Sequence, residues 1–217
     1  MRATARVLVA LLGLALLAGA PASATHRDPE RRIVAADEAR ARSVLLRRAD
    51  LGPGYRATPS GAPAHIDCAA LDESDLTLAG DAESPTWTRD VSVISSYALV
   101  YRTVADANAS WRRSTSAAGR RCVGVELRRL VGSAGGRLVS LRVLAFPRLA
   151  PRTTAFRLDF ELQARGPRFT IDLIVLQRAR VQAYFYVGSA LVPPVRAEEV
   201  RLARLVAARL AQAARGA

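Results

Sequence analysis

Few residues in this 217-residue chain have the chemistry for nucleophilic or acid–base catalysis. The sequence contains two histidines, His26 and His65, and a nucleophilic side chain needs such a base beside it. It contains no Gly-x-Ser-x-Gly elbow and no Gly-x-Gly-x-x-Gly or Walker loop. The sequence therefore predicts a protein that is not an enzyme. The alternative is a hydrolase that uses His65, with Asp67 as a conceivable partner.

Two cysteines, Cys68 and Cys122, are the next reactive groups. In an exported chain an even pair of cysteines predicts a disulfide, whereas two free thiols are the alternative. The disulfide would close a loop of about 54 residues, which the chain-entropy model values at ~4 kcal/mol. Neither histidine lies at zinc-finger spacing from a cysteine, so we expect no metal site, and nothing in the sequence predicts a cofactor.

Arginine supplies all 32 basic residues, against 19 acidic ones, and the formal net charge is +13. A guanidinium group matches the geometry of a phosphate with two parallel hydrogen bonds. Pairs of neighbouring arginines recur along the chain, and two of these pairs fall in one predicted helical region: Arg120, Arg121, Arg128 and Arg129. They are candidates for binding a polyanion, either an anionic lipid or a cell-wall phosphate polymer. The alternative is that they only keep a helix soluble.

The segment from residue 57 to 101 has the opposite charge, with seven acidic residues and one base. It predicts an acidic surface loop on a basic body, or a site for a cationic ligand; it lacks the acid spacing and glycine of a calcium loop. The candidate residues for binding an unknown small molecule or lipid also lie here: Trp87, Arg89, Tyr97 and Tyr101. An alternative for Trp87 is that it caps the edge of the core.

The first 24 residues have the three parts of a secretory signal peptide: basic Arg2 and Arg6, an apolar run from residue 7 to 18, and small residues up to Ala24. A membrane-spanning helix needs roughly 20 apolar residues, so we do not expect a permanent transmembrane protein. Ala20 stands where a lipoprotein signal has its lipidated cysteine, so no lipid anchor is expected. We therefore predict a secreted or extracytoplasmic protein, and nucleic acid is not an expected partner.

These residues must be positioned by a single domain, residues 25–217. The pattern predicts a helix capped by Asp28 and continuing through Arg48, with Ile33 on its buried face, and a long loop over residues 53–90. A strand over 91–103 and a helical region over 104–132, broken near Gly119, follow. Four strands, at 137–146, 152–163, 168–178 and 180–188, precede a last helix that Pro193 and Pro194 open.

The strand over 152–163 alternates most clearly. Phe156, Leu158, Phe160 and Leu162 are predicted to face the core, and the charged residues between them, Arg157, Asp159 and Glu161, to face solvent. Short connections between the four strands favour antiparallel pairing. The predicted fold is α+β, a mainly antiparallel sheet of about five strands flanked by N-terminal, middle and C-terminal helices.

Three segments resemble a known family: VLLRRADLGPGY (44–55), SYALVYRTVADANASWRRSTSAAGRRC (96–122) and YFYVGSALVPPVRAEEVRLARLVAARL (184–210). They are similar to actinobacterial extracytoplasmic sensor-like domains, the group of the PknH-type kinase sensor domain and the LpqN-like lipoproteins. The resemblance implies a helix-flanked antiparallel sheet with a cleft that binds a ligand without converting it. The chain departs from the group in lacking a kinase, a lipidated cysteine and a second disulfide. The expected function is thus a non-catalytic ligand-binding or sensor-like domain.

The expected processing can be checked by intact-mass analysis of the exported product. We expect an N-terminus at Thr25 and a mass two hydrogens below that of the reduced chain. A full-length product retained in the membrane would contradict the predicted export.

Overall fold

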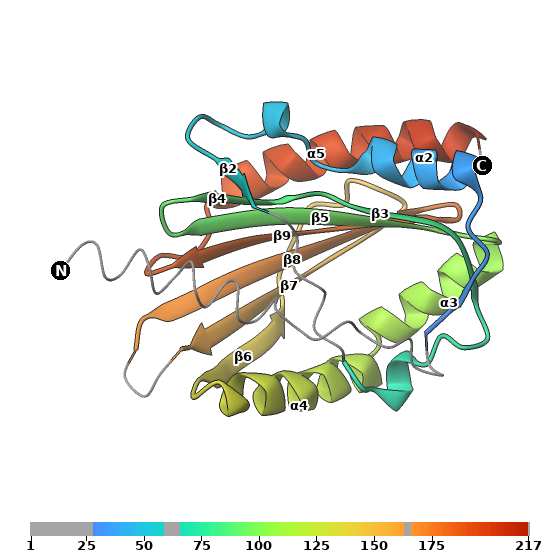
Figure 1. Ribbon diagram of the computed structural model, residues 1–217. Helices are drawn as coiled ribbons and strands as arrows, with labels where there is room; N and C mark the ends of the chain where they lie inside the picture. Colours follow the sequence, from blue (N-terminus) through green and yellow to red (C-terminus); the bar gives the residue numbers. More distant parts are fainter. Residues whose placement is uncertain (1–27, 59–65, 163–165, 217) are drawn as a thin grey trace.

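The computed structural model describes residues 28–58, 66–162 and 166–216, which form a curved sheet with helices on both of its faces (Figure 1). The strands are β1 (Glu30–Arg31), β2 (Arg56–Thr58), β3 (Thr77–Glu83), β4 (Thr86–Arg89), β5 (Ser92–Tyr101), β6 (Arg137–Val143), β7 (Arg152–Glu161), β8 (Arg168–Arg178) and β9 (Val181–Ala190). The helices are α2 (Ala35–Val44), α3 (Val104–Thr115), α4 (Ala117–Ser133) and α5 (Arg196–Ala213). Three short 3₁₀ helices are Arg48–Asp50, Ala69–Leu71 and Ala214–Gly216.

The sheet has the strand order β1-β3-β5-β9-β8-β7-β6, and β4 joins it by pairing with β2 and β5. The neighbours pair antiparallel, except that β1 runs parallel to β3. This confirms the predicted α+β class with a mainly antiparallel sheet. All five predicted strands are present, as β5 to β9. The sheet has nine strands rather than about five because four shorter strands form in the first 90 residues.

The N-terminal helix is shorter than predicted. Instead of continuing a helix from Asp28, the chain pairs Glu30 and Arg31 with β3, and α2 begins only at Ala35. Strand pairing at the sheet edge thus overrides the local capping signal. Ile33, predicted to be buried, is 41% exposed, because it precedes the helix. Glu38 and Arg42, four residues apart on α2, form an ion pair at 2.8 Å.

The two faces of the sheet have separate cores. On one face, α2 and α5 cover aliphatic and aromatic side chains of β5, β8 and β9, which include Ile94, Ile174 and Phe185. On the other face, near α4, the predicted inward residues of β7 are all buried: Phe156, Leu158, Phe160 and Leu162. A Cβ on Gly80 of β3 would lie 2.4 Å from the Asp37 carbonyl carbon, so the close approach of α2 to the sheet requires glycine there.

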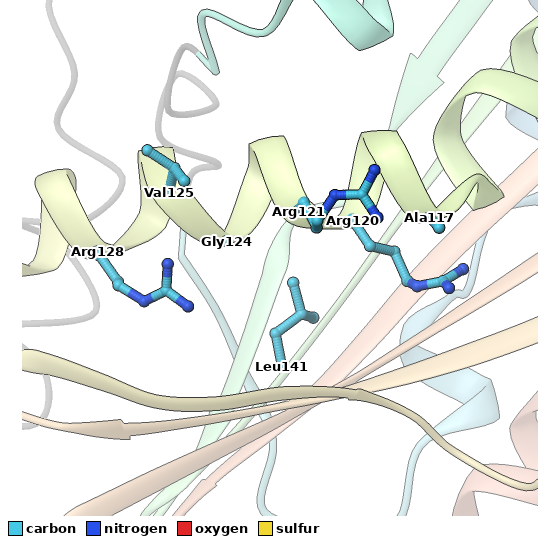
Figure 2. Close-up of a pocket in the computed structure, with 7 residues that line it drawn as sticks. All are labelled: Ala117, Arg120, Arg121, Gly124, Val125, Arg128 and Leu141. Carbon is cyan, nitrogen blue, oxygen red and sulfur yellow. The ribbon is translucent and has the colours of Figure 1, made fainter.

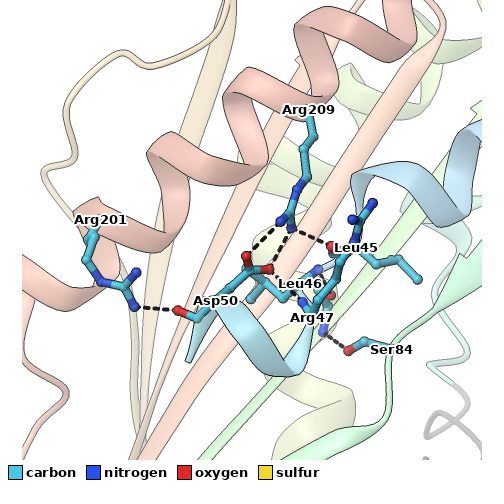
Figure 3. A network of polar contacts seen from close by, with 8 residues as sticks. Leu45, Leu46, Arg47, Asp50, Ser84, Arg201 and Arg209 are labelled. Carbon is cyan, nitrogen blue, oxygen red and sulfur yellow. Dashed lines mark hydrogen bonds and ion pairs between the residues drawn. The ribbon is translucent and has the colours of Figure 1, made fainter. Parts of the chain in front are cut away.

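An ion pair joins α5 to the segment that follows α2, and a hydrogen bond attaches that segment to the sheet (Figure 3). The Arg209 guanidinium donates to both carboxylate oxygens of Asp50, at 2.6 and 2.7 Å, and to the Leu45 carbonyl at 2.7 Å. Burial acts to raise the pKa of Asp50, but the hydrogen bonds from Arg209 and from the Arg47 N–H outweigh it and hold that pKa below its ordinary value. The Leu46 N–H donates to Ser96 of β5, which ties this connection to the sheet.

The charged face of β7 is not solvated as predicted, because α5 lies above it. Arg157 donates two hydrogen bonds to Asp172 of β8, at 2.6 and 2.5 Å, and Asp172 is fully buried. Asp159 is half-buried and accepts hydrogen bonds from Thr170 and Ser140. The alternation of the sequence correctly places these residues on one face, but the opposite face is covered as well.

Glu199 of α5 is also fully buried beside this cluster. One of its carboxyl oxygens has no hydrogen-bond donor within the described part of the chain, and Arg196 contacts the other at 3.3 Å. Burial, a hydrogen bond with Asp172 and the charge of Asp172 raise the pKa of Glu199 to about 8. Protonated Glu199 can donate to Asp172, which satisfies both carboxyl groups.

This arrangement makes stability depend on pH. Glu199 holds a proton in the folded state that it loses in the unfolded state above its ordinary pKa near 4.5, so its contribution is complete below that pH and is lost as pH rises through about 8. The melting temperature of the native protein should fall over this range by roughly 10 °C. Glu199→Gln keeps the donor to Asp172 and should remove most of this slope, so the variant should melt higher than the native protein at pH 9. Parallel slopes in calorimetric scans of both proteins would contradict the assignment.

Candidate anion-binding site

Helix α4 carries the predicted cluster of arginines, and its start is fixed by a local cap. The hydroxyl of Ser116 accepts a hydrogen bond from the Gly119 N–H at 2.8 Å, and so begins α4 directly after α3. The break between the two helices therefore lies at Ser116, three residues before the predicted position at Gly119. A Cβ on Gly119 would lie 2.4 Å from the Arg113 carbonyl oxygen, so Gly119 allows the tight passage from α3 into α4.

A disulfide and an ion pair fix these helices to the acidic segment. The sulfur atoms of Cys68 and Cys122 are 2.11 Å apart, which joins α4 to the short 3₁₀ helix at residues 69–71. Arg113 of α3 donates to both carboxylate oxygens of Asp75, at 2.6 and 2.7 Å. Asp81 of the same segment pairs with Arg31 at 2.8 Å. Carboxylates of the acidic segment thus form ion pairs with arginines of the rest of the domain. Among the described residues, no group of three potential metal ligands comes together.

Between α4 and β6 lies a hollow of about 470 Å³ (Figure 2). We call it the α4 hollow, and it is lined by Ala117, Arg120, Arg121, Gly124, Val125, Arg128 and Leu141. The helical residues recur at spacings of three or four, which places them along one side of α4. Figure 2 shows the Leu141 side chain rising from β6 between those of Arg120 and Arg128. The hollow therefore combines an apolar floor with guanidinium groups.

The arginines of the hollow differ in their commitments to the rest of the protein. Arg120 donates to the Thr115 carbonyl at 2.6 Å and so caps the end of α3. Arg121 and Arg128 are exposed, and neither makes a hydrogen bond or ion pair with another residue in the described ranges. Arg129 does not line the hollow and instead pairs with Glu126 at 2.9 Å. Two guanidinium groups are thus available to a ligand.

The structure brings together three of the four predicted polyanion-binding residues, Arg120, Arg121 and Arg128, and separates Arg129 from them. The sequence did not indicate Leu141, because only the packing of β6 against α4 brings it there. Helical spacing from Arg121 could have indicated Val125 and Arg128 as neighbours. Gly124, whose Cβ would meet Leu141 at 3.7 Å, sits between them with no side chain of its own.

The four residues predicted to bind a small molecule do not form one site. Trp87 is buried in the core under α2 and α5, with its indole N–H unpaired within the described chain, and Arg89 lies over the ring of Tyr55 at 4.5 Å. Tyr97 and Tyr101 belong to the other sheet face, where Tyr101 is fully buried. Tyr97 is 37% exposed and packs against Tyr184, with 5.9 Å between the centroids of the two rings. His65, the base of the alternative hydrolase, lies outside the described residues.

Tyr101 belongs to a buried polar network beneath α3. Its hydroxyl lies 2.9 Å from a carboxyl oxygen of Glu73 and 2.7 Å from the Ser110 hydroxyl, and the amide of Gln182 donates to the Ala107 carbonyl at 2.6 Å. Burial raises the pKa of Glu73 and that of Tyr101. These groups satisfy one another, so the network holds α3 on the sheet and offers no open group to a ligand.

Comparison with known proteins places the chain only distantly. No family model and no curated protein matches it. The extracellular domain of PknH from Mycobacterium tuberculosis is similar in structure, with 10% identity, a TM-score of 0.44, and coverage of 86% of this chain and 99% of that one. An uncharacterised Mycobacterium smegmatis protein, the Rv0999 ortholog, has 14% identity, a TM-score of 0.43, and coverage of 80% and 96%. Likeness of this degree assigns neither a ligand nor a function.

The disulfide should stabilise the fold and the position of α4. In the chain-entropy model a loop of this length is worth ~4 kcal/mol, so Cys68→Ser/Cys122→Ser should lower the free energy of unfolding by about that amount. Urea denaturation without reductant measures the difference. Reductant should lower the midpoint of the native protein and leave that of the variant unchanged. Equal midpoints for the two proteins without reductant would contradict the bond.

Proposed function

We propose that this protein is an extracytoplasmic, non-catalytic binding domain that holds a phosphate-bearing ligand in the α4 hollow. One observation carries the proposal: Arg121 and Arg128 are uncommitted cations at a hollow of about 470 Å³ on a helix that a disulfide anchors. A volume of this size suits a small molecule or a lipid headgroup. The signal-like leader and the cysteine pair support a place outside the cytoplasmic membrane.

The chemistry of the hollow favours a ligand that bears a phosphate over an uncharged apolar ligand. Guanidinium groups present paired donors to phosphate oxygens, and Leu141 with Ala117 gives an apolar surface for the carbon skeleton of the ligand. The described lining of the hollow consists of arginine, glycine and aliphatic residues, which offer no nucleophile or general base for a reaction of the ligand. Binding without conversion is the activity that follows. Anionic lipids and wall polymers both carry such phosphates.

A second candidate is an apolar ligand on the sheet face that carries Tyr97. Half-buried aromatic and aliphatic residues of β8 and β9 continue this surface: Phe169, Ile171, Leu173, Tyr184 and Tyr186. Cross-strand pairing places Leu173 beside Tyr186, and Tyr184 beside Tyr97. Dependence on salt separates the two candidates, because electrostatic binding to arginine weakens as salt rises whereas apolar binding persists.

The test is calorimetric titration of the exported protein with two probes, glycerol 1-phosphate and a glycerol-phosphate oligomer. Arg121→Gln/Arg128→Gln should weaken binding at least tenfold, because both free guanidinium groups are lost. Arg129→Gln is the matched control and should change the affinity less than twofold, since Arg129 already pairs with Glu126. Raising sodium chloride from 50 to 300 mM should weaken binding by a further factor of about ten.

An equal loss of affinity in the Arg129→Gln control would contradict the site, since removal of any positive charge on α4 would then weaken binding. Binding of both probes that resists salt, or no binding of either, would contradict the proposed function. A preference for the oligomer would identify a polymer, and equal affinity per phosphate a headgroup-sized ligand.

A further inference from the structure

The connection between β9 and α5 carries several strongly exposed apolar side chains. It consists of Leu191, Val192, Pro193, Pro194 and Val195, and we call it the 191–195 loop. Leu191, Val192 and Val195 are 70%, 62% and 69% exposed, the three highest values among the large hydrophobic residues of the described chain. Three such side chains within five residues form a patch that contributes nothing to the core.

The backbone of the loop is strained at the residue with the most exposed side chain. Leu191 has a φ of +76°, a backbone conformation that residues with a Cβ rarely adopt and that glycine adopts freely. The chain thus carries a leucine where glycine would cost less free energy, and the leucine side chain gains no burial in the monomer. A contact outside the monomer would provide that burial.

Positive charge flanks this patch. The Leu191 N–H donates to the Arg168 carbonyl at 3.0 Å, so Arg168 lies directly beside the loop, and its side chain is 69% exposed. Arg196 follows the loop and stacks on Phe146 at 4.3 Å. Of the nearby acids, Glu161 pairs with Arg137 at 2.6 Å and more distantly with Arg168 at 3.8 Å, and Asp90 lies on the adjacent β4–β5 turn next to Arg89. An apolar tip flanked by the exposed Arg168 and the half-buried Arg196 complements an anionic lipid surface.

The loop also carries few backbone N–H groups that would need a new partner in a lipid interface. Pro193 and Pro194 have no N–H, and the N–H of Leu191 is already bonded to Arg168. A second copy of the chain fits less well, because a stable dimer buries roughly 800 Å² on each partner. Three side chains on a narrow loop supply only part of that area.

We infer that the 191–195 loop inserts its apolar side chains into the interface of an anionic phospholipid membrane, with Arg168 and Arg196 beside the lipid phosphates. The inference does not rest on the proposed function, because the loop shares no residue with the α4 hollow. Cosedimentation of the exported protein with phosphatidylcholine vesicles, with and without phosphatidylglycerol, tests it. We expect binding only to the vesicles that contain phosphatidylglycerol.

Two matched variants show whether the loop makes the contact. Val192→Ser/Val195→Ser should weaken vesicle binding at least tenfold, whereas Val104→Ser/Val143→Ser, which changes two exposed valines elsewhere, should change it less than twofold. Leu191→Gly separates binding from folding, because it removes the side chain and relieves the strained φ. This variant should melt above the native protein and yet bind vesicles more weakly.

Four results would overturn the inference. The first is native-like binding by Val192→Ser/Val195→Ser, and the second is equal binding to neutral vesicles. The third is a native dimer that the loop variant abolishes while vesicles bind neither protein, since a second copy is then the occupant. If Arg121→Gln/Arg128→Gln loses vesicle binding while the loop variants keep it, the α4 hollow makes the contact; that result would support the proposed function and refute this inference.

Discussion

The disulfide between Cys68 and Cys122 is the constraint on which the position of α4 depends. It joins the helix to a segment of low regular structure, and the bidentate pair of Arg113 with Asp75 adds a second attachment nearby. Both contacts join parts of the chain that lie far apart in sequence. The separation between α4 and β6, and with it the hollow, follows from these attachments.

The other side of the sheet is held by charge rather than by sulfur. Arg209 with Asp50, and Arg157 with Asp172, each place two hydrogen bonds between planar groups in a partly or fully buried setting. Removing one partner of such a pair leaves a buried charge, so the first pair fixes the position of α5 and the second joins β7 to β8. The sheet therefore carries a helix layer held by ion pairs on one face and a disulfide-anchored helix on the other.

Much of the fold follows from patterns in the sequence, and the failures have physical causes. The alternation from Phe156 to Leu162 predicted β7, and Pro193 with Pro194 indicated the start of the last helix, α5. Strand β3 was hidden because its seven residues form a strand only when β5 pairs with them. The cap signal at Asp28 was overridden in the same way by the pairing of β1 with β3.

The candidate site was predicted in part. Three of its arginines were grouped correctly because they lie on one helix, where spacing determines the face. Leu141 belongs to a strand that reaches α4 through tertiary packing, and no local pattern reports that. The grouping of Trp87 with Tyr97 failed because the two residues lie on opposite faces of the sheet, which sequence proximity does not distinguish.

Strand β6 is the terminal strand of the sheet beyond β7, and its ladder shifts register between Leu138 and Ser140. An edge with an irregular ladder and flanking arginines, Arg137 and Arg142, is a poor template for a strand from another molecule. Addition of a strand from a second copy to this edge is therefore disfavoured, and the β6 edge beside the α4 hollow is protected against edge-to-edge association.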